Sequence, residues 1–154
     1  MVQYERAYDL SEGVSRFFLL EDLAKAAFMA NQYEKAGDYA NTMLAEDSPD
    51  WNSGNRIHHG NLVLGRIALA EGDIEEAKRR LIAAGETAGS PQLDSFGPNM
   101  MLAKELLQKG ENEVVLEYFS LCSKFWIMGQ DSLKEWSDLV RANRVPEFSG
   151  NLWY

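Results

Sequence analysis

The amino-acid sequence predicts an all-α fold, and three observations lead to that prediction. The segments between the four prolines are rich in Ala, Leu, Glu, Lys and Met, which favour helices. Their apolar residues recur every three or four positions, as on one face of a helix. No segment shows the alternation of β-branched and polar residues that is typical of strands. At 154 residues, the chain has the size of one domain that can bury a core.

The segment 55–85 predicts a helical hairpin, which is two antiparallel helices joined by a tight turn. Gly72 interrupts the apolar pattern of the first helix, and Asp73 is a good N-cap for the second. Glu76 would complete a capping box with Asp73, and Gly85 is suited to end the second helix. The apolar face of the first helix consists of Leu62, Leu64, Ile67, Ala68, Leu69 and Ala70.

Two other segments repeat this pattern, at about 12–46 and at about 97–127. Gly110 ends the first helix of the later segment, and Asn31 takes the place of the turn glycine in the earlier one. Pro49 and Pro91 fall between the hairpins, so we expect loops there.

These hairpins resemble tetratricopeptide repeats over about residues 17–126. The resemblance rests on small and apolar residues at the spacings of that repeat. The matching residues are Leu64, Gly65, Ala68, Gly72, Asp73, Ala77 and Leu81 in the middle copy, Leu102, Ala103, Leu106, Gly110, Val115 and Phe119 in the last, and Leu23, Ala24, Ala27, Asn31, Ala36 and Ala40 in the first. The copies are spaced more widely than the repeat's usual length of about 34 residues, and they lack its Trp and Tyr. The resemblance implies a right-handed superhelix of about three hairpins in a single domain, 1–154.

The C-terminal part predicts a capping helix at about 131–143 and an aromatic tail at 146–154. Repeat arrays need a cover for the apolar face of their last unit, and Trp136, Leu139 and Val140 form a suitable stripe. We expect the tail to pack back on its own domain. A dimer contact or a docking segment for another protein is the alternative.

Composition excludes several classes of function. The formal net charge of −9 argues against a general nucleic-acid binder and against attraction to anionic membranes. Cys122 is the only cysteine, so neither an internal disulfide nor a thiolate zinc cage can form. The N-terminus is too polar for a signal peptide, and no apolar run could span a bilayer. We therefore expect a cytoplasmic protein, either a monomer or a homodimer.

His58 and His59 are the obvious candidates for a metal or catalytic site. Adjacent helical residues point about 100° apart, so the two rings cannot share one ligand on one face. No suitable second ligand stands three or four residues away. We therefore expect partly exposed imidazoles in the first turn of a helix, although His59 could hydrogen-bond a ligand in a groove.

No other pattern points to chemistry. Neither a nucleophile elbow nor a phosphate-binding glycine loop occurs, and Cys122 lies in an apolar helix where a core role is expected. The sequence predicts no enzyme, no cofactor and no metal site. The 90–99 loop is long enough to be functional, but we favour a structural role. In that role Leu93 and Phe96 pin the loop to the core, while Asp94 or Ser95 caps the next helix.

A binding surface is the most specific functional expectation. In tetratricopeptide arrays the first helices line a concave groove, which commonly binds an extended peptide. Equivalent positions of the three copies hold a basic row, and three residues later an apolar row: Lys25, Arg66 and Lys104, then Phe28, Leu69 and Leu107. Such a groove suits an acidic and apolar peptide segment or a free C-terminus. The alternative is that the basic residues are ordinary solvated side chains.

The sequence thus favours a scaffold for protein–protein interaction. A structural or oligomerisation module acting through the tail, and a small-molecule binder or enzyme around His59 and the 90–99 loop, are the alternatives. The partner's identity is not encoded in any motif.

Overall fold

The computed structural model describes residues 2–46 and 50–153, and all regular structure within them is helical. The all-α prediction is therefore confirmed, while Pro49 and Tyr154 lie outside the described residues. The helices are α1 (Val2–Asp9), α2 (Gly13–Met29), α3 (Tyr33–Ala45), α4 (Ser53–Ala70), α5 (Ile74–Gly85), α6 (Pro91–Phe96), α7 (Met101–Leu107), α8 (Asn112–Cys122) and α9 (Gln130–Arg141), with 3-10 turns η1 (Ile127–Gly129) and η2 (Ser149–Leu152).

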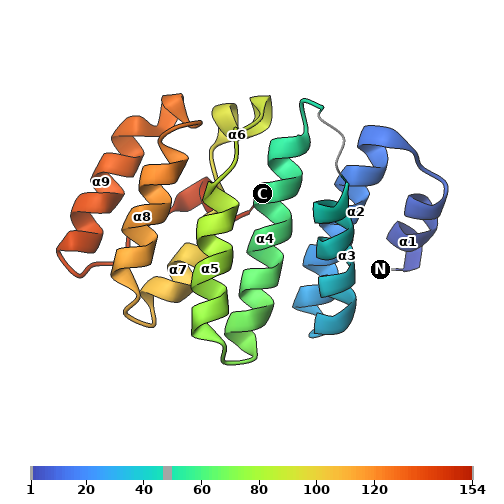
Figure 1. Ribbon diagram of the computed structural model, residues 1–154, viewed down its shortest axis with the longest axis horizontal. Helices are drawn as coiled ribbons and strands as arrows, with labels where there is room; N and C mark the ends of the chain where they lie inside the picture. Colours follow the sequence, from blue (N-terminus) through green and yellow to red (C-terminus); the bar gives the residue numbers. More distant parts are fainter. Residues whose placement is uncertain (1, 47–49, 154) are drawn as a thin grey trace.

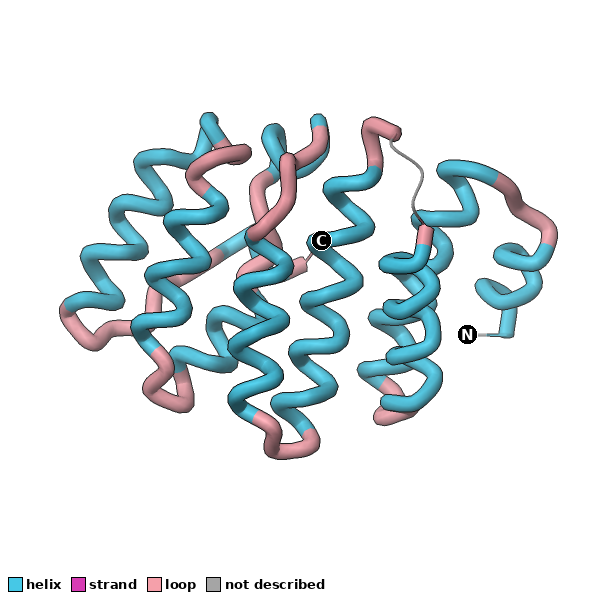
Figure 2. Tube along the Cα trace, viewed as in Figure 1, coloured by secondary structure: helices cyan, strands magenta, loops and turns pink. Residues whose placement is uncertain are grey.

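Apart from α6, which lies at one edge beside the ends of α4 and α5, the helices form a row that follows the chain from α1 to α9 (Figure 1). The pairs α2–α3, α4–α5 and α7–α8 correspond to the three ranges expected to be hairpins, except that α4 begins at Ser53, two residues before its expected range. Their short turns lie along one edge of the row, and the longer connections lie along the opposite edge (Figure 2). Within the described residues, no helix is both long and apolar enough to cross a membrane.

One turn geometry ends α2, α4, α7 and α9. The turn residues Asn31, Gly72, Gly110 and Asn143 have positive φ angles of 57°, 88°, 85° and 55°. In each turn that residue donates to the carbonyl three positions earlier, and the next residue donates to the carbonyl five positions earlier. These bonds satisfy the last free carbonyls of the helix. The predicted turn positions at 31, 72 and 110 are confirmed, and α9 ends as the first helices of the hairpins do.

The N-terminus of α5 is capped as predicted, but by only half of the expected capping box. The Asp73 carboxylate accepts a hydrogen bond from the backbone N–H of Glu76 at 2.9 Å. The reciprocal bond does not form, because the Asp73 N–H donates to Ala68 O and the Glu76 carboxylate binds Arg79 and Arg80.

Small buried residues let the helices approach closely. The positions predicted to be small are all buried: Ala24, Gly65, Ala103, Ala36, Ala77 and Val115. A Cβ atom at Gly65 would lie 2.4 Å from Leu102 Cδ2 on α7 and 3.0 Å from Arg80 Cβ on α5. The absence of a side chain at Gly65 therefore sets how closely α4 packs against both neighbours.

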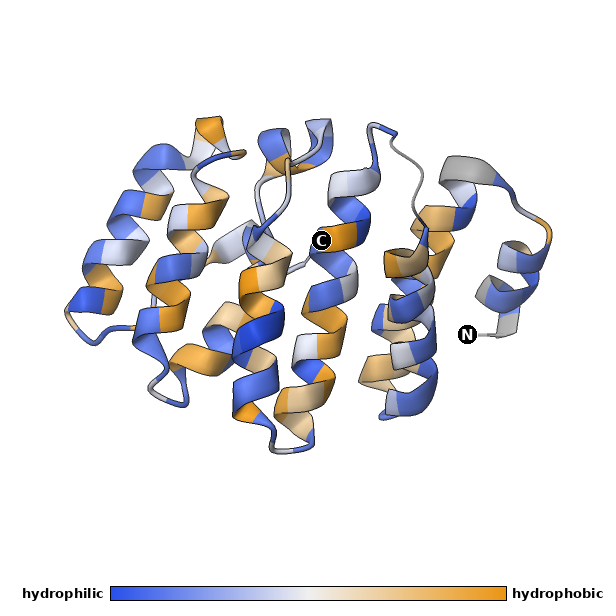
Figure 3. Cartoon of the chain, in the orientation of Figure 1, coloured by the Kyte–Doolittle hydropathy of each residue, from blue (hydrophilic) through white to orange (hydrophobic). Residues whose placement is uncertain are grey.

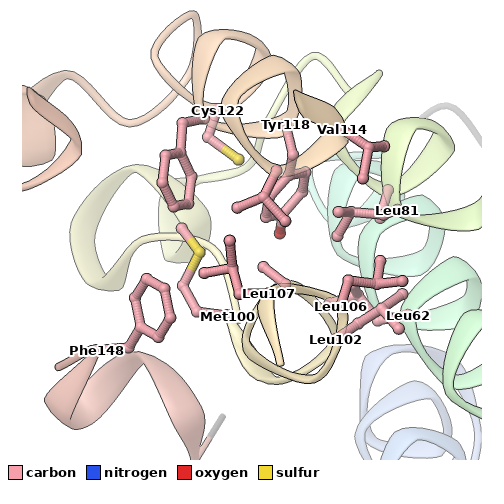
Figure 4. Close-up of a cluster of buried hydrophobic side chains, with 14 of the residues drawn as sticks. Leu62, Leu81, Met100, Leu102, Leu106, Leu107, Val114, Tyr118, Cys122 and Phe148 are labelled. Atoms are coloured by element: carbon pink, nitrogen blue, oxygen red, sulfur yellow. The ribbon is translucent and has the colours of Figure 1, made fainter. Parts of the chain in front are cut away.

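The buried side chains form two clusters that meet at α4. The N-terminal cluster comprises Phe17, Leu20, Ala24, Ala27, Ala36, Ala40, Met43, Val63 and Ile67. The C-terminal cluster joins α4, α5, α7, α8, α9 and the tail, and its members include Leu62, Leu81, Met100, Tyr118 and Phe148 (Figure 4). Hydrophobic and hydrophilic bands alternate along α4, α5, α8 and α9 (Figure 3), as expected of helices with one buried face.

The C-terminal tail packs on its own chain, as the sequence predicts. Phe148 is 1% exposed and its ring lies 5.0 Å from that of Trp136, edge to face. The Asn151 carbonyl accepts from Met100 N, and its side-chain amide donates to Pro98 O. Trp153, by contrast, is 80% exposed.

The 90–99 loop contains a short helix, α6, that the sequence analysis missed. Ser90 caps it by accepting from Leu93 N, and Leu93 is buried as expected. Phe96 is 62% exposed, so the prediction that it pins the loop is wrong. Trp126 packs against the loop instead. Its ring lies so close to Gly97 that a Cβ atom added at Gly97 would be 2.4 Å from the Trp126 ring.

The predicted caps after α6 are also wrong. Neither Asp94 nor Ser95 caps α7, since the Asn99 side chain accepts from Met101 N at 2.9 Å. Asp94 instead accepts from the backbone N–H of Ile127, which ties α6 to η1.

Candidate functional site

Arg66 connects three of the helices that were expected to line a groove. Its Nε lies 3.0 and 3.1 Å from the two carboxylate oxygens of Glu105 on α7, and its Nη2 lies 2.7 Å from one of them. Its guanidinium carbon lies 4.3 Å from the centre of the Phe28 ring on α2, a cation–π contact. We call Lys25, Phe28, Arg66, Lys104 and Glu105 the α2–α4–α7 surface.

Lys25 and His59 share one partner, Glu21. The Glu21 carboxylate is 6% exposed and accepts a hydrogen bond from Lys25 Nζ one turn later on α2. His59 Nδ1 lies 3.4 Å from the same carboxylate oxygen. The ring of His59 is 3% exposed, so the expectation that it could offer a hydrogen bond in a groove is wrong. It is enclosed between α2 and α4.

Burial also fixes the charge of His59. Desolvation lowers the pKa of His59 to about 3, and the positive charge of Lys25 acts in the same direction. The imidazole is therefore neutral near pH 7, and its contact with Glu21 is not an ion pair.

The expected apolar row is not an open strip. Leu107 is 7% exposed and belongs to the C-terminal cluster, where Figure 4 shows it among the core side chains. This corrects the prediction for Leu107, and the cause is that α7 is short and uses both Leu106 and Leu107 to fill the space beside α8. Leu69 is half-buried against the same cluster, and Phe28 lies beneath Arg66.

Two of the three expected cations are already paired within the chain. Lys25 binds Glu21 and Arg66 binds Glu105, whereas Lys104 forms no ion pair with any described residue. The side chains of Arg66 and Glu105 are 21% and 28% exposed. Partly exposed pairs contribute little net stability, so Arg66 can exchange Glu105 for another carboxylate at small cost.

His58 is a structural residue in the second turn of α4. Its Nε2 accepts from Asn99 N at 3.0 Å, so the proton sits on Nδ1, which donates to Ala84 O at 2.9 Å. The Tyr118 hydroxyl donates to the carbonyl of Asn99, and its ring stacks on His58. Both histidines are buried, which corrects the expectation of partly exposed imidazoles. The error arose because α4 begins at Ser53, earlier than expected.

Neither a cluster of metal-ligating side chains nor an activated cysteine is found among the described residues. The described residues contain no group of three or more His, Cys, Asp or Glu side chains close enough to hold a metal ion. Burial raises the pKa of the Cys122 thiol well above its usual value, so it is a poor nucleophile.

Sequence reasoning missed the two carboxylates that organise the site. Glu21 stands four residues before Lys25, a spacing that signals a helical ion pair. Glu105 has no such signal, because it is far from Arg66 in the sequence and meets it only through the packing of α4 on α7.

Comparison with known proteins adds no identification. The chain matches no protein-family model, no curated protein and no solved structure. The resemblance to tetratricopeptide repeats therefore stays a prediction from the residue pattern.

Proposed function

We propose that this chain is a non-enzymatic, cytoplasmic helical-repeat scaffold that binds a peptide segment of another protein on the α2–α4–α7 surface. The proposal includes a tetratricopeptide-like superhelix with that surface on its concave side. The observation that carries it is the run of contacts from Phe28 through Arg66 to Glu105, which makes one continuous surface from three helices. A peptide lying across it would contact all three hairpins.

The ligand we propose is acidic and partly apolar. A ligand carboxylate would replace Glu105 on Arg66 and keep the bidentate geometry that guanidinium groups prefer. A second carboxylate would meet Lys104, whose charge is not balanced by an ion pair within the described residues. Apolar side chains of the ligand would lie near Phe28.

Paired variants of Arg66 and Glu105 test this proposal. Peptides selected against the wild-type chain from a displayed random library are measured by fluorescence anisotropy against Arg66→Gln, Lys104→Gln and Glu105→Gln. Arg66→Gln and Lys104→Gln should each weaken binding about tenfold, the effect of losing one charge-assisted hydrogen bond. Glu105→Gln should strengthen it, because Arg66 no longer has to leave a carboxylate.

Lys134→Gln, at an exposed residue of α9, serves as the control and should bind normally. Circular dichroism confirms that each variant is folded. Equal affinity of the selected peptides for all four variants would show that this surface is not the binding site.

The exposed Trp153 favours a second candidate, self-association through the tail. Phe148 is buried, so Trp153 is the large aromatic residue that the described tail leaves on the surface. Light scattering after size exclusion tests this candidate. A dimer that becomes a monomer in Trp153→Ala would support it, and a wild-type monomer would remove it. A site around His59 and the 90–99 loop is not favoured, since the loop is bonded to His58 and His59 contacts Glu21.

A further inference from the structure

A cavity of about 650 Å³ lies at the N-terminal end of the row, apart from the α2–α4–α7 surface. Its walls come from α1, α2, the end of α3 and the start of α4. The residues that line it are Tyr8, Glu12, Arg16, Phe17, Leu20, Thr42, Met43, Glu46, Asp50, Asn52 and Arg56. Its volume falls in the range of small-molecule sites, about 300–1,000 Å³.

One wall of the cavity is apolar. Phe17 and Leu20 come from successive turns of α2, and Met43 lies at the end of α3. All three are less than one-tenth exposed and belong to the N-terminal cluster. An apolar chain in the cavity would therefore extend this cluster, and burying it would be favourable.

The charged groups of the cavity include one ion pair, a cation that is not part of an ion pair within the described residues, and the carboxylates of Glu12 and Glu46. Arg56 Nη1 lies 3.1 Å from both carboxylate oxygens of Asp50, and this bond is the main cause that lowers the pKa of Asp50. Arg16 is exposed and lies over the Tyr8 ring at 4.4 Å, and it forms no ion pair with a described residue. Arg16 is thus positioned by Tyr8 and retains its capacity to bind an anion.

Asn52 supplies an unsatisfied donor. It is 1% exposed, and its Oδ1 accepts from the Asn55 side chain. Its Nδ2 is buried and has no hydrogen-bond partner in the described part of the chain. A buried amide without a partner is unfavourable, and a ligand oxygen that accepts from it would remove that cost.

We infer that this cavity binds an apolar chain that ends in a carboxylate. The chain would lie against Phe17, Leu20 and Met43, and the carboxylate would lie between Arg16 and Asn52. A single negative charge is indicated, because the carboxylates of Glu12, Glu46 and Asp50 also line the cavity and would repel a multivalent anion such as phosphate. Two sources share this chemistry, a small fatty acid and the free C-terminus of an apolar peptide.

Methionine-methyl NMR tests the inference on the full chain, with octanoate as the probe. The Met43 methyl signal, assigned with Met43→Leu, should shift on titration. The Met100 methyl signal should not, because Met100 is buried in the C-terminal cluster. Arg16→Gln changes an exposed side chain and should weaken octanoate binding about tenfold. Arg141→Gln, at an exposed position of α9, should leave binding unchanged.

Matched ligands separate the head group from the chain. Octanamide should bind the wild-type protein about tenfold more weakly than octanoate does. The affinity for octanamide should be the same in wild type and in Arg16→Gln. The dipeptide acetyl-Leu-Phe, compared with its C-terminal amide, distinguishes a peptide terminus from a fatty acid as the source. An unmoved Met43 signal, equal binding of octanoate and octanamide, or tighter binding of octylamine would each overturn the inference.

Discussion

His58 cannot serve as a ligand, because both of its ring nitrogens already bond to the backbone. Ala84 O accepts from one and Asn99 N donates to the other, so a single side chain on α4 connects the end of α5 to the start of α7. His59, its neighbour, faces Glu21 on α2 instead. The two rings lie almost perpendicular, and each one joins α4 to a different part of the molecule.

Replacing His58 by Phe should keep most of the buried volume and remove both hydrogen bonds. Ala84 O and Asn99 N would then be buried without partners, at about 1–3 kcal/mol each. We expect urea unfolding to show a loss of about 2–5 kcal/mol in the free energy of unfolding. Lys134→Ala, at an exposed position of α9, should change it by less than about 0.5 kcal/mol. A loss no larger than this control would mean that neither bond matters for stability.

The two buried histidines should make the protein sensitive to mild acid. Burial is the largest cause that lowers the pKa of each to about 3, against 6.5 in the unfolded chain. Between these values the unfolded chain binds protons that the folded chain does not, so stability falls as the pH falls below about 6.5. Above about pH 6.5 the histidines are neutral in both the folded and the unfolded chain, so they no longer lower the stability.

Urea unfolding at pH 7, 6 and 5 measures this effect. Each histidine should contribute a decrease of about 1 kcal/mol per pH unit in the lower part of this range. Carboxylates with low pKa values, such as Asp50, act only in stronger acid. His59→Asn should reduce the slope. Equal stability at pH 7 and pH 5 would contradict the burial of both rings.

Local sequence signals determine where the helices end. Contacts between residues that are distant in the sequence determine which helices pack together. Asn31, Gly72 and Gly110 could be recognised as turns because only a few residue types adopt positive φ easily. The burial of Leu107 and the exposure of Phe96 could not be predicted, since they depend on which side chains from other helices fill the same space. The same holds for Glu105, which meets Arg66 from another hairpin, and for the cavity at α1.

Three glycine-to-alanine substitutions should have different effects according to position. Gly72→Ala places a Cβ in open space but at a φ of 88°, and should cost about 1 kcal/mol. Gly65→Ala should cost about 1–3 kcal/mol, because the new methyl group would overlap Leu102. Gly37→Ala should stabilise α3 by about 0.5–1 kcal/mol, since its Cβ would meet Ile67 at an ordinary 3.8 Å.

Thermal unfolding of the three glycine variants gives the comparison directly. Gly37→Ala is the internal control for the chemical change itself. If Gly72→Ala stabilised the protein as Gly37→Ala should, the assignment of a left-handed conformation to Gly72 would be wrong.

The molecule as a whole depends on the tail to close its C-terminal cluster. Phe148 contacts Trp136 and Phe119, and Asn151 binds the segment that carries Asn99 and its bond to His58. The tail therefore supports both the last helix and the start of α7.

Phe148→Ala should destabilise the protein by about 3–5 kcal/mol, as expected for truncating a buried aromatic ring. Hydrogen exchange should increase most in α7, α8 and α9. Trp153→Ala, a substitution of a second tail aromatic that is 80% exposed, should have little effect. Similar losses for both variants would show that the tail does not pack as described.

The position of α4 between the two clusters has a consequence for synthesis of the chain. Every member of the N-terminal cluster precedes residue 68, so that cluster is complete as soon as α4 has emerged from the ribosome. The C-terminal cluster needs Phe148, which is translated well after α4. During this interval, one face of α4 is already packed and the other is exposed to solvent. Ribosome-bound chains halted after α4 should therefore resist proteolysis through α2–α4, whereas chains halted before Phe148 should still be cleaved in α7–α9.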